Sequence, residues 1–232
     1  MCRTEREEKI MEEKMFCFQC EQTAGCSGCR GARGVCGKQD TTAKLQDELT
    51  GALIGLAHAV GEDKAELETD RLMMESLFAT LTNVNFDDES LKKQIEAVHQ
   101  EKEKYVPGCI SCQEPCGRTT DYSMKKLWED EEDIRSLKSL LLFGLRGTAA
   151  YACHAMVLGY TDEQVNAFFY KGMAAIGEDR DMEKLLPLVM EAGAVNLKCM
   201  ELLDKANTET YGIPAPAKVE MKVEKGPFIV IS

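Results

Sequence analysis

The chain has 232 residues, a formal net charge of −12 at pH 7 and eleven cysteines. This length suffices for one large domain or two small ones with a hydrophobic core. The negative charge argues against nucleic-acid partners, because a phosphate backbone would be repelled. The longest apolar stretch, residues 139–157, is interrupted by Arg146 and by small residues, so it predicts a buried helix rather than a membrane span. We therefore expect a soluble cytoplasmic protein with neither nucleic-acid nor membrane partners.

Five of the cysteines lie within the twenty residues 17–36. The C-x2-C pair Cys17 and Cys20 places two thiolates within reach of one metal centre, and nearby glycines let the backbone fold around it. Disulfides are the least favoured interpretation, because residues 1–14 are mostly charged without an apolar signal region and eleven cysteines cannot all pair. A structural zinc site with four cysteine ligands and an iron–sulfur cluster both remain open, and the irregular spacing of the later cysteines favours the cluster.

A family resemblance is carried by six segments, residues 15–24, 34–38, 45–47, 145–152, 165–168 and 203–208. Together they resemble the hybrid-cluster proteins, also called hydroxylamine reductases or prismane proteins. In that family four cysteines near the N-terminus bind a cubane [4Fe-4S] cluster or, in some members, a [2Fe-2S] cluster. The resemblance implies that the ligands here are Cys17, Cys20, Cys29 and Cys36. Cys26 has no counterpart in the family pattern, so it is either a spare thiol or a rival to Cys29.

From residue 41 onward, apolar residues recur every three or four positions, which predicts six helices. Asp133 is predicted to cap a long helix, and Thr161 with Gln164 resembles a capping box. The last helix is predicted at about residues 181–205, where Pro187 would introduce a kink or mark the true start. Short connections between helices favour an all-α fold of paired antiparallel helical bundles. The resemblance implies that these are two antiparallel three-helix bundles.

The sequence predicts four regions along the chain. Residues 1–14 form a charged N-terminal extension, residues 15–40 a cysteine-rich iron–sulfur loop and residues 41–210 a helical-bundle domain. Residues 211–232 are predicted to be a linker and the first strand of an α/β domain that is absent, because a lone buried strand at 227–232 needs neighbours in a sheet. The resemblance implies that the hybrid Fe-S-O cluster and its ligands belong to those missing C-terminal domains.

A second group of cysteines, Cys109, Cys112 and Cys116, has the spacing C-x2-C-x3-C. It supplies three thiolates for a possible second metal site, or it is a loop rich in proline and glycine with incidental thiols, which is the favoured interpretation.

Outside the cysteine groups, the histidines are predicted to be packing residues, and Cys199 is predicted to act as a small buried hydrophobe. Cations near the cysteine loop would raise the reduction potential of a cluster there, or would serve solubility alone. The three histidines are His58, His99 and His154, and the three cations are Arg30, Arg33 and Lys38.

These patterns lead to one principal hypothesis and two alternatives. In the principal hypothesis, the chain is an electron-transfer module that receives electrons from an unidentified donor protein. As the resemblance implies, it passes them to a hybrid cluster that reduces hydroxylamine or nitric oxide in the remaining domains. A cluster held by four thiolates has no open iron position, so this chain alone is expected to be inactive. The alternatives are a zinc-stapled helical interaction module without redox activity, and a metal-free bundle whose cysteines are idle.

Overall fold

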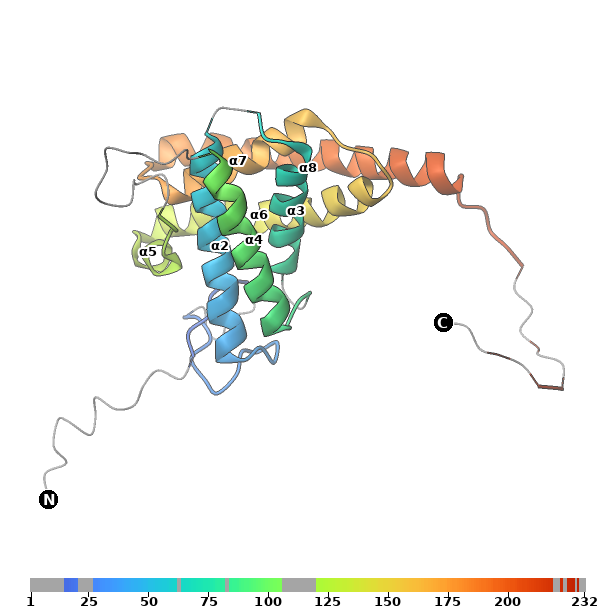
Figure 1. The fold of residues 1–232 in the computed structure, drawn as a ribbon, viewed down its shortest axis with the longest axis horizontal. Coiled ribbons are helices and arrows are strands. Elements are labelled where there is room, and N and C mark those ends of the chain that lie inside the picture. Colours follow the sequence, from blue (N-terminus) through green and yellow to red (C-terminus); the bar gives the residue numbers. More distant parts are fainter. Residues whose placement is uncertain are drawn as a thin grey trace, which may run out of the picture.

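The structure is a computed structural model that describes residues 15–20, 27–61, 64–81, 84–105, 120–218, 222, 225–227 and 229 (Figure 1). Within these residues it contains seven α-helices and no strand beyond a single β-bridge. The predicted all-α class is therefore confirmed. The helices are α2 (Asp40–Val60), α3 (Leu67–Ala79), α4 (Asp88–Tyr105), α5 (Met124–Glu129), α6 (Glu132–Val157), α7 (Glu163–Gly177) and α8 (Met182–Tyr211).

The helices lie in two groups that cross each other (Figure 1). In one group α2 lies along α4, and α3 contacts both of them. In the other group α6, α7 and α8 contact one another, and the short helix α5 packs against α6 and α2. The groups are joined where α2 packs against α7 and α3 packs against α6. The cysteine-rich segment lies at the end of α2 that begins with Asp40 (Figure 1).

The core forms along the apolar stripes that the helical spacing predicts. On α2 the residues Leu49, Leu53, Leu56 and Val60 are all buried in one continuous core, which also takes in side chains from α3, α4, α6 and α7. Removing such side chains from water is the main favourable term in folding. The core therefore joins both groups of helices.

The start of α7 differs from the predicted capping box. The N-cap is Asp162 rather than Thr161, and its carboxylate accepts hydrogen bonds from the backbone N–H groups of Gln164 and Val165. A carboxylate at this position also interacts favourably with the positive end of the helix dipole. The predicted box was wrong by one residue.

Two further predictions of helix starts need correction. Helix α6 begins at Glu132 after an N-cap at Glu131, so Asp133 lies in the first turn and is not the cap. Helix α8 begins at Met182, with the side chain of Asp181 accepting a hydrogen bond from the N–H of Lys184. Pro187 therefore lies inside α8 and does not mark its start. The helix also extends past residue 205 to Tyr211.

Helix α6 is long and apolar enough to cross a membrane by length and composition, and it alone is so among the described residues. A core helix of a soluble protein passes the same test, so one such helix is weak evidence for a span. In this fold α6 packs against α3, α5, α7 and α8. It also carries the fully buried Arg146. These contacts agree with the predicted buried helix.

Parts of the chain that carried predictions lie outside the described residues. They include residues 1–14 and most of the predicted strand at 227–232. The structure does not test these predictions.

Two glycines inside helices give opposite expectations for the same substitution. A Cβ on Gly51 of α2 would lie 2.1 Å from the carbonyl oxygen of Tyr122, whereas a Cβ on Gly193 of α8 would meet nothing within 4 Å. We expect Gly51→Ala to lower the free energy of unfolding by roughly 1–3 kcal/mol through this clash. Gly193→Ala should raise it by about 0.5–1 kcal/mol through helix propensity. Urea unfolding followed by circular dichroism measures both, and equal effects of the two changes would contradict the close approach.

Candidate metal centre and the charged network beneath it

The four predicted ligands all lie among the described residues, and none is in a disulfide. Cys17 and Cys29 are buried, with 6% and 7% exposure, while Cys20 and Cys36 are half-buried. The N–H of Cys17 donates to the carbonyl of Cys29 at 3.1 Å, and the N–H of Cys29 donates back at 2.7 Å. This antiparallel bridge places two predicted ligands directly opposite each other on the two arms of the loop.

Close packing around the bridge fixes the path of the loop. Gly28 has a φ of +80°, and a Cβ there would lie 2.7 Å from the ring of Phe16. Met15 is fully buried in a small cluster with Cys17, Cys29 and Ala43 of α2. A Cβ on Gly34 would lie 3.4 Å from both the Met15 methyl group and the Sγ of Cys36. The side chain of Cys36 therefore approaches the same small cluster.

Aromatic side chains cover one side of the loop. The rings of Phe16 and Phe18 each contact Trp128 of α5, with centroid separations of 5.1 and 4.9 Å. The guanidinium of Arg135 lies over the Trp128 ring at 4.8 Å. These contacts attach the loop to α5 and α6, and they shield its inner face from water.

The described thiols are not gathered into one complete metal-binding set. Among the described ranges, no three Cys, His, Asp or Glu side chains converge closely enough to hold a metal ion. Cys26, the predicted rival ligand, lies outside the described residues, as do Cys109, Cys112 and Cys116 of the possible second site. The ligand assignments therefore stay predictions.

A buried hydrogen-bond network lies beneath the loop, centred on the side-chain amide of Gln19. Its oxygen accepts from Lys38 Nζ at 2.6 Å. Its nitrogen donates to Asp47 Oδ1 at 2.7 Å and to the carbonyl of Ala43 at 2.9 Å. Lys38 is only 3% exposed, although ammonium groups are seldom buried without a partner. The network ties both arms of the loop to α2.

A second buried cation, Arg146, reaches the loop from α6. It is 1% exposed, donates to the backbone carbonyl of Gln19 at 3.1 Å, and donates to Thr50 Oγ1 at 2.9 Å. Its Nε is buried and has no hydrogen-bond partner among the residues that the structure describes. Burial lowers the pKa of Arg146 to about 10, against the opposing effects of Asp47, Cys17 and Cys20. The guanidinium therefore stays charged at neutral pH.

The charges of this network set the electrostatics at the cysteines. Burial raises the pKa of Asp47 to about 6, although the hydrogen bond from Gln19 and the charges of Arg146 and Lys38 oppose the shift. Burial also raises the pKa of Cys17, while a backbone hydrogen bond from Gln19 and the charge of Lys38 lower it. At neutral pH two buried cations face one carboxylate. The surplus positive charge favours an anion at the loop.

The sequence predictions found only part of this network. Of the three predicted cations, only Lys38 is buried in it. Arg30 lies over the ring of Phe16 at 5.1 Å, and Arg33 is exposed. Arg146, Asp47 and Gln19 were not predicted to act at the site. The available signal was a charged residue, Arg146, in the middle of the mostly apolar stretch 139–157.

Cys199 and His58 have the structural surroundings that were predicted for them, whereas His154 is exposed and the side chain of His99 is 41% exposed, so neither is a buried packing residue. His58 Nε2 lies 3.1 Å from the carbonyl of Ala174, and the His154 ring meets Phe78 edge-on at 5.5 Å. His99 pairs with Asp121 at 2.7 Å. Cys199 is fully buried. None of the three histidines belongs to a metal-binding group among the residues that the structure describes.

Comparison with protein families agrees with the cysteine pattern and the helical fold. Residues 15–232 match the model of the Prismane/CO dehydrogenase family. The chain belongs to this family.

Several curated proteins of known name are similar to this chain. A hydroxylamine reductase of Solidesulfovibrio magneticus is 44% identical over 243 residues, covering 94% of this chain and 44% of the relative. Hydroxylamine reductases of Thermodesulfovibrio yellowstonii and Methanocaldococcus jannaschii are 43% and 39% identical, each over 94% of this chain and less than half of the relative. This prismane-family chain therefore spans about 44% of the length of the relatives it matches.

The raised pKa of Asp47 predicts a pH dependence of stability. Because its folded pKa of about 6 lies above the ordinary value of 3.8, the folded state holds the proton more tightly. Ionisation of Asp47 therefore lowers the free energy of unfolding as pH rises from about 4 to about 6. In Asp47→Asn, which keeps an acceptor for Gln19, we expect the free energy of unfolding not to show this fall with pH. Urea unfolding of the wild-type protein and the variant in the same metal state, between pH 4.5 and 7.5, measures the difference between their free energies of unfolding. If that difference does not change with pH, the raised pKa of Asp47 is contradicted.

Proposed function

We propose that this chain is the iron–sulfur electron-transfer portion of a hydroxylamine reductase-like protein. The observation that carries the proposal is the pair of buried cations, Arg146 and Lys38, beneath the cysteine loop. An iron–sulfur cluster held by four thiolates has a net negative charge, which would complement this surplus of positive charge. Within the described part of the chain, the Nε of Arg146 is a buried donor without a partner, and an acceptor at the loop would satisfy it. Family membership and the names of the relatives support the same interpretation.

The donor chemistry of the loop suits a [4Fe-4S] cluster. Cys17, Cys20, Cys29 and Cys36 would supply its thiolates, and a bound cluster would supply one-electron transfer. Zinc accepts the same four thiolates, so a zinc-stapled interaction module without redox activity is the alternative.

The residues around the loop have separable roles in this proposal. Gln19 holds the two arms of the loop in place through its hydrogen bonds to Lys38 and Asp47. Arg146 and Lys38 stabilise negative charge at the thiolates. The aromatic residues Phe16 and Trp128 exclude water from one side. Nearby positive charge raises the reduction potential of a cluster, because the reduced form carries the extra negative charge. Exclusion of water acts in the opposite direction, because it removes solvation from that charge.

The wider organisation of the protein is part of the proposal. Residues 41–210 would form two three-helix bundles, and residues 211–232 would lead into an α/β domain. The relatives are more than twice as long as the matched segment, which leaves room for such domains. The hybrid cluster, and with it the reduction of hydroxylamine or nitric oxide, would belong to that remaining part. A donor protein in the cytoplasm would supply the electrons.

Metal analysis of anaerobically purified protein tests the cofactor. We expect about four irons and four sulfides per chain, together with an EPR signal after dithionite reduction. Cys17→Ala, Cys20→Ala, Cys29→Ala and Cys36→Ala should each lower iron and sulfide, because each removes a ligand. Cys199→Ala, which removes a buried thiol of α8, is the matched control and should retain both. About one zinc without sulfide would instead support the interaction module, and loss of iron from Cys26→Ala but not Cys29→Ala would reassign the third ligand.

The role of Arg146 has a redox test. We expect Arg146→Met to lower the midpoint potential of the cluster, because it removes a buried positive charge without adding a thiol or carboxylate. Arg146→Lys should recover part of the shift, and Arg33→Met, which changes an exposed cation of the same loop, should have little effect. Potentiometric EPR titration measures the potential, and iron content checks that each variant is loaded. Equal potentials in the loaded wild-type protein and Arg146→Met would contradict the electrostatic role.

If the catalytic centre belongs to the remaining part of the protein, this chain alone should not catalyse the reduction of hydroxylamine. We expect the purified, cluster-loaded chain to show no hydroxylamine-dependent oxidation of reduced methyl viologen, because four thiolates leave no open iron position. Hydroxylamine turnover proportional to cluster content would contradict the proposal that the catalytic centre lies elsewhere.

A further inference from the structure

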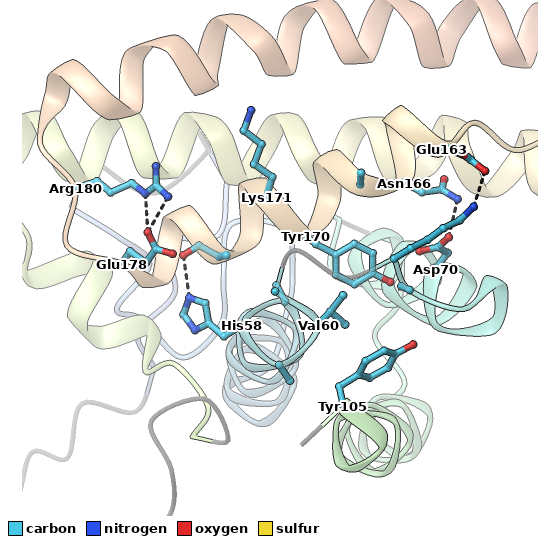
Figure 2. A pocket seen from close by; sticks show the side chains of 17 residues that line it. His58, Val60, Asp70, Tyr105, Glu163, Asn166, Tyr170, Lys171, Glu178 and Arg180 are labelled. Carbon is cyan, nitrogen blue, oxygen red and sulfur yellow. Dashed lines mark hydrogen bonds and ion pairs between the residues drawn. The ribbon is translucent and has the colours of Figure 1, made fainter. Parts of the chain in front are cut away.

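A second polar site lies away from the cysteine loop, in a cavity of about 1210 Å³. The cavity is bounded by the end of α2, by α3, by the end of α4 and by α7 (Figure 2). None of its lining residues belongs to the loop segments 15–20 and 27–38. Apolar side chains such as Val60 and Ala174 share the wall with several polar ones. Concave sites with a mainly apolar wall and a few convergent polar groups are typical of small-molecule binding.

Two buried polar groups meet inside this cavity. Tyr170 is 5% exposed and Asp70 is 8% exposed, and their side chains point toward each other in Figure 2. Among the described residues, the Tyr170 hydroxyl makes no hydrogen bond that meets strict geometric limits, although it interacts with the nearby carboxylate of Asp70. One oxygen of Asp70, Oδ2, accepts from the amide of Asn166 at 2.8 Å. A buried tyrosine hydroxyl usually finds a partner, and the carboxylate of Asp70 is close enough to interact with it. The two groups therefore form a buried polar pair at the cavity wall.

As far as the described residues show, each charged side chain of the cavity lining has an ion-pair partner except Asp70. Lys64 pairs with Glu163 at 2.6 Å, Lys171 with Glu191 at 2.6 Å, and Arg180 with Glu178 at 2.8 Å. Asp70 makes no ion pair with any residue that the structure describes, although Lys64 is near enough to influence it electrostatically. The negative charge of Asp70 is therefore the one in the cavity without a direct counterion among the described residues.

The electrostatics of Asp70 follow from its burial. Burial raises the pKa of Asp70, and Tyr170, Asn166 and Lys64 oppose that shift. The pKa of Tyr170 is raised by burial and then by the negative charge of Asp70. The hydroxyl therefore stays protonated, and the carboxylate is the group that a cation would stabilise.

We infer that this cavity binds a small organic molecule with a protonated amine. The ammonium group would donate to the carboxylate of Asp70 and to the hydroxyl oxygen of Tyr170. The tyrosine ring beside it, and that of Tyr105 on α4, offer aromatic surfaces that attract cations. An alkyl portion would lie along the apolar wall formed by Val60 and Ala174. An anionic ligand is disfavoured, because Asp70 would repel it.

Binding of n-butylamine, with butan-1-ol as the neutral probe of similar size, tests the inference. We expect saturable heat from butylamine in isothermal titration calorimetry at millimolar concentrations, and none from butan-1-ol. Asp70→Asn keeps an acceptor for Asn166 but removes the charge, so it should weaken binding at least tenfold. Tyr170→Phe removes a single oxygen and should weaken binding severalfold. Asp204→Asn, an exposed carboxylate on α8, is the control and should bind like the wild-type protein.

A further variant tests the same binding of butylamine. Lys64→Gln removes the nearest competing cation and should tighten binding of butylamine. If Asp70→Asn fails to fold, as checked by circular dichroism, Tyr170→Phe and Lys64→Gln still decide the question. Absence of binding by the wild-type protein, equal heat from butan-1-ol, or unchanged affinity in Tyr170→Phe would each overturn the inference and leave a water-filled cavity. The assay needs no redox activity, so its outcome is independent of the cluster proposal.

Discussion

The buried guanidinium of Arg146 is the interaction on which the arrangement of the N-terminal half depends. A charged group removed from water must be hydrogen-bonded, or the folded state is strongly disfavoured. Arg146 meets this requirement by donating to the backbone of Gln19 and to Thr50, which lie 127 and 96 residues away in the chain. It thereby fixes the cysteine loop, α2 and α6 relative to one another. Neither apolar packing nor helix propensity specifies this relationship so directly.

The same constraint gives the loop its chemical character. Because Gln19 holds Lys38 on one side and Asp47 on the other, the two buried cations and one carboxylate lie beneath the thiols at fixed positions. The aromatic contacts of Phe16 and Phe18 with Trp128 attach the loop from another direction. The site is thus an anion-favouring environment assembled from α2, α5, α6 and the loop. Its charge would remain whichever metal the cysteines bind.

The helical frame also holds a polar site of the opposite character. Beneath the loop the surplus charge is positive. In the cavity at the other end of α2, the carboxylate of Asp70 has no ion-pair partner among the described residues (Figure 2). Helix α2 runs between the two, and its interior is closely packed, with Gly51 tight against the backbone of Tyr122. Close packing of this kind keeps both sites rigid. The all-α scaffold therefore carries two polar sites of opposite charge.

The sequence by itself determined the helical class, the buried stripe of α2, the cysteine motif and the family, since periodicity and cysteine spacing are properties of neighbouring residues. Only the tertiary structure decided that Asp162 rather than Thr161 caps α7, that Arg146 meets Gln19, and that Asp70 meets Asn166. The last two contacts join residues 127 and 96 positions apart. Helical spacing reveals which face of a helix is buried, but not which distant residue covers it. That choice depends on how the helices cross, which local patterns do not encode.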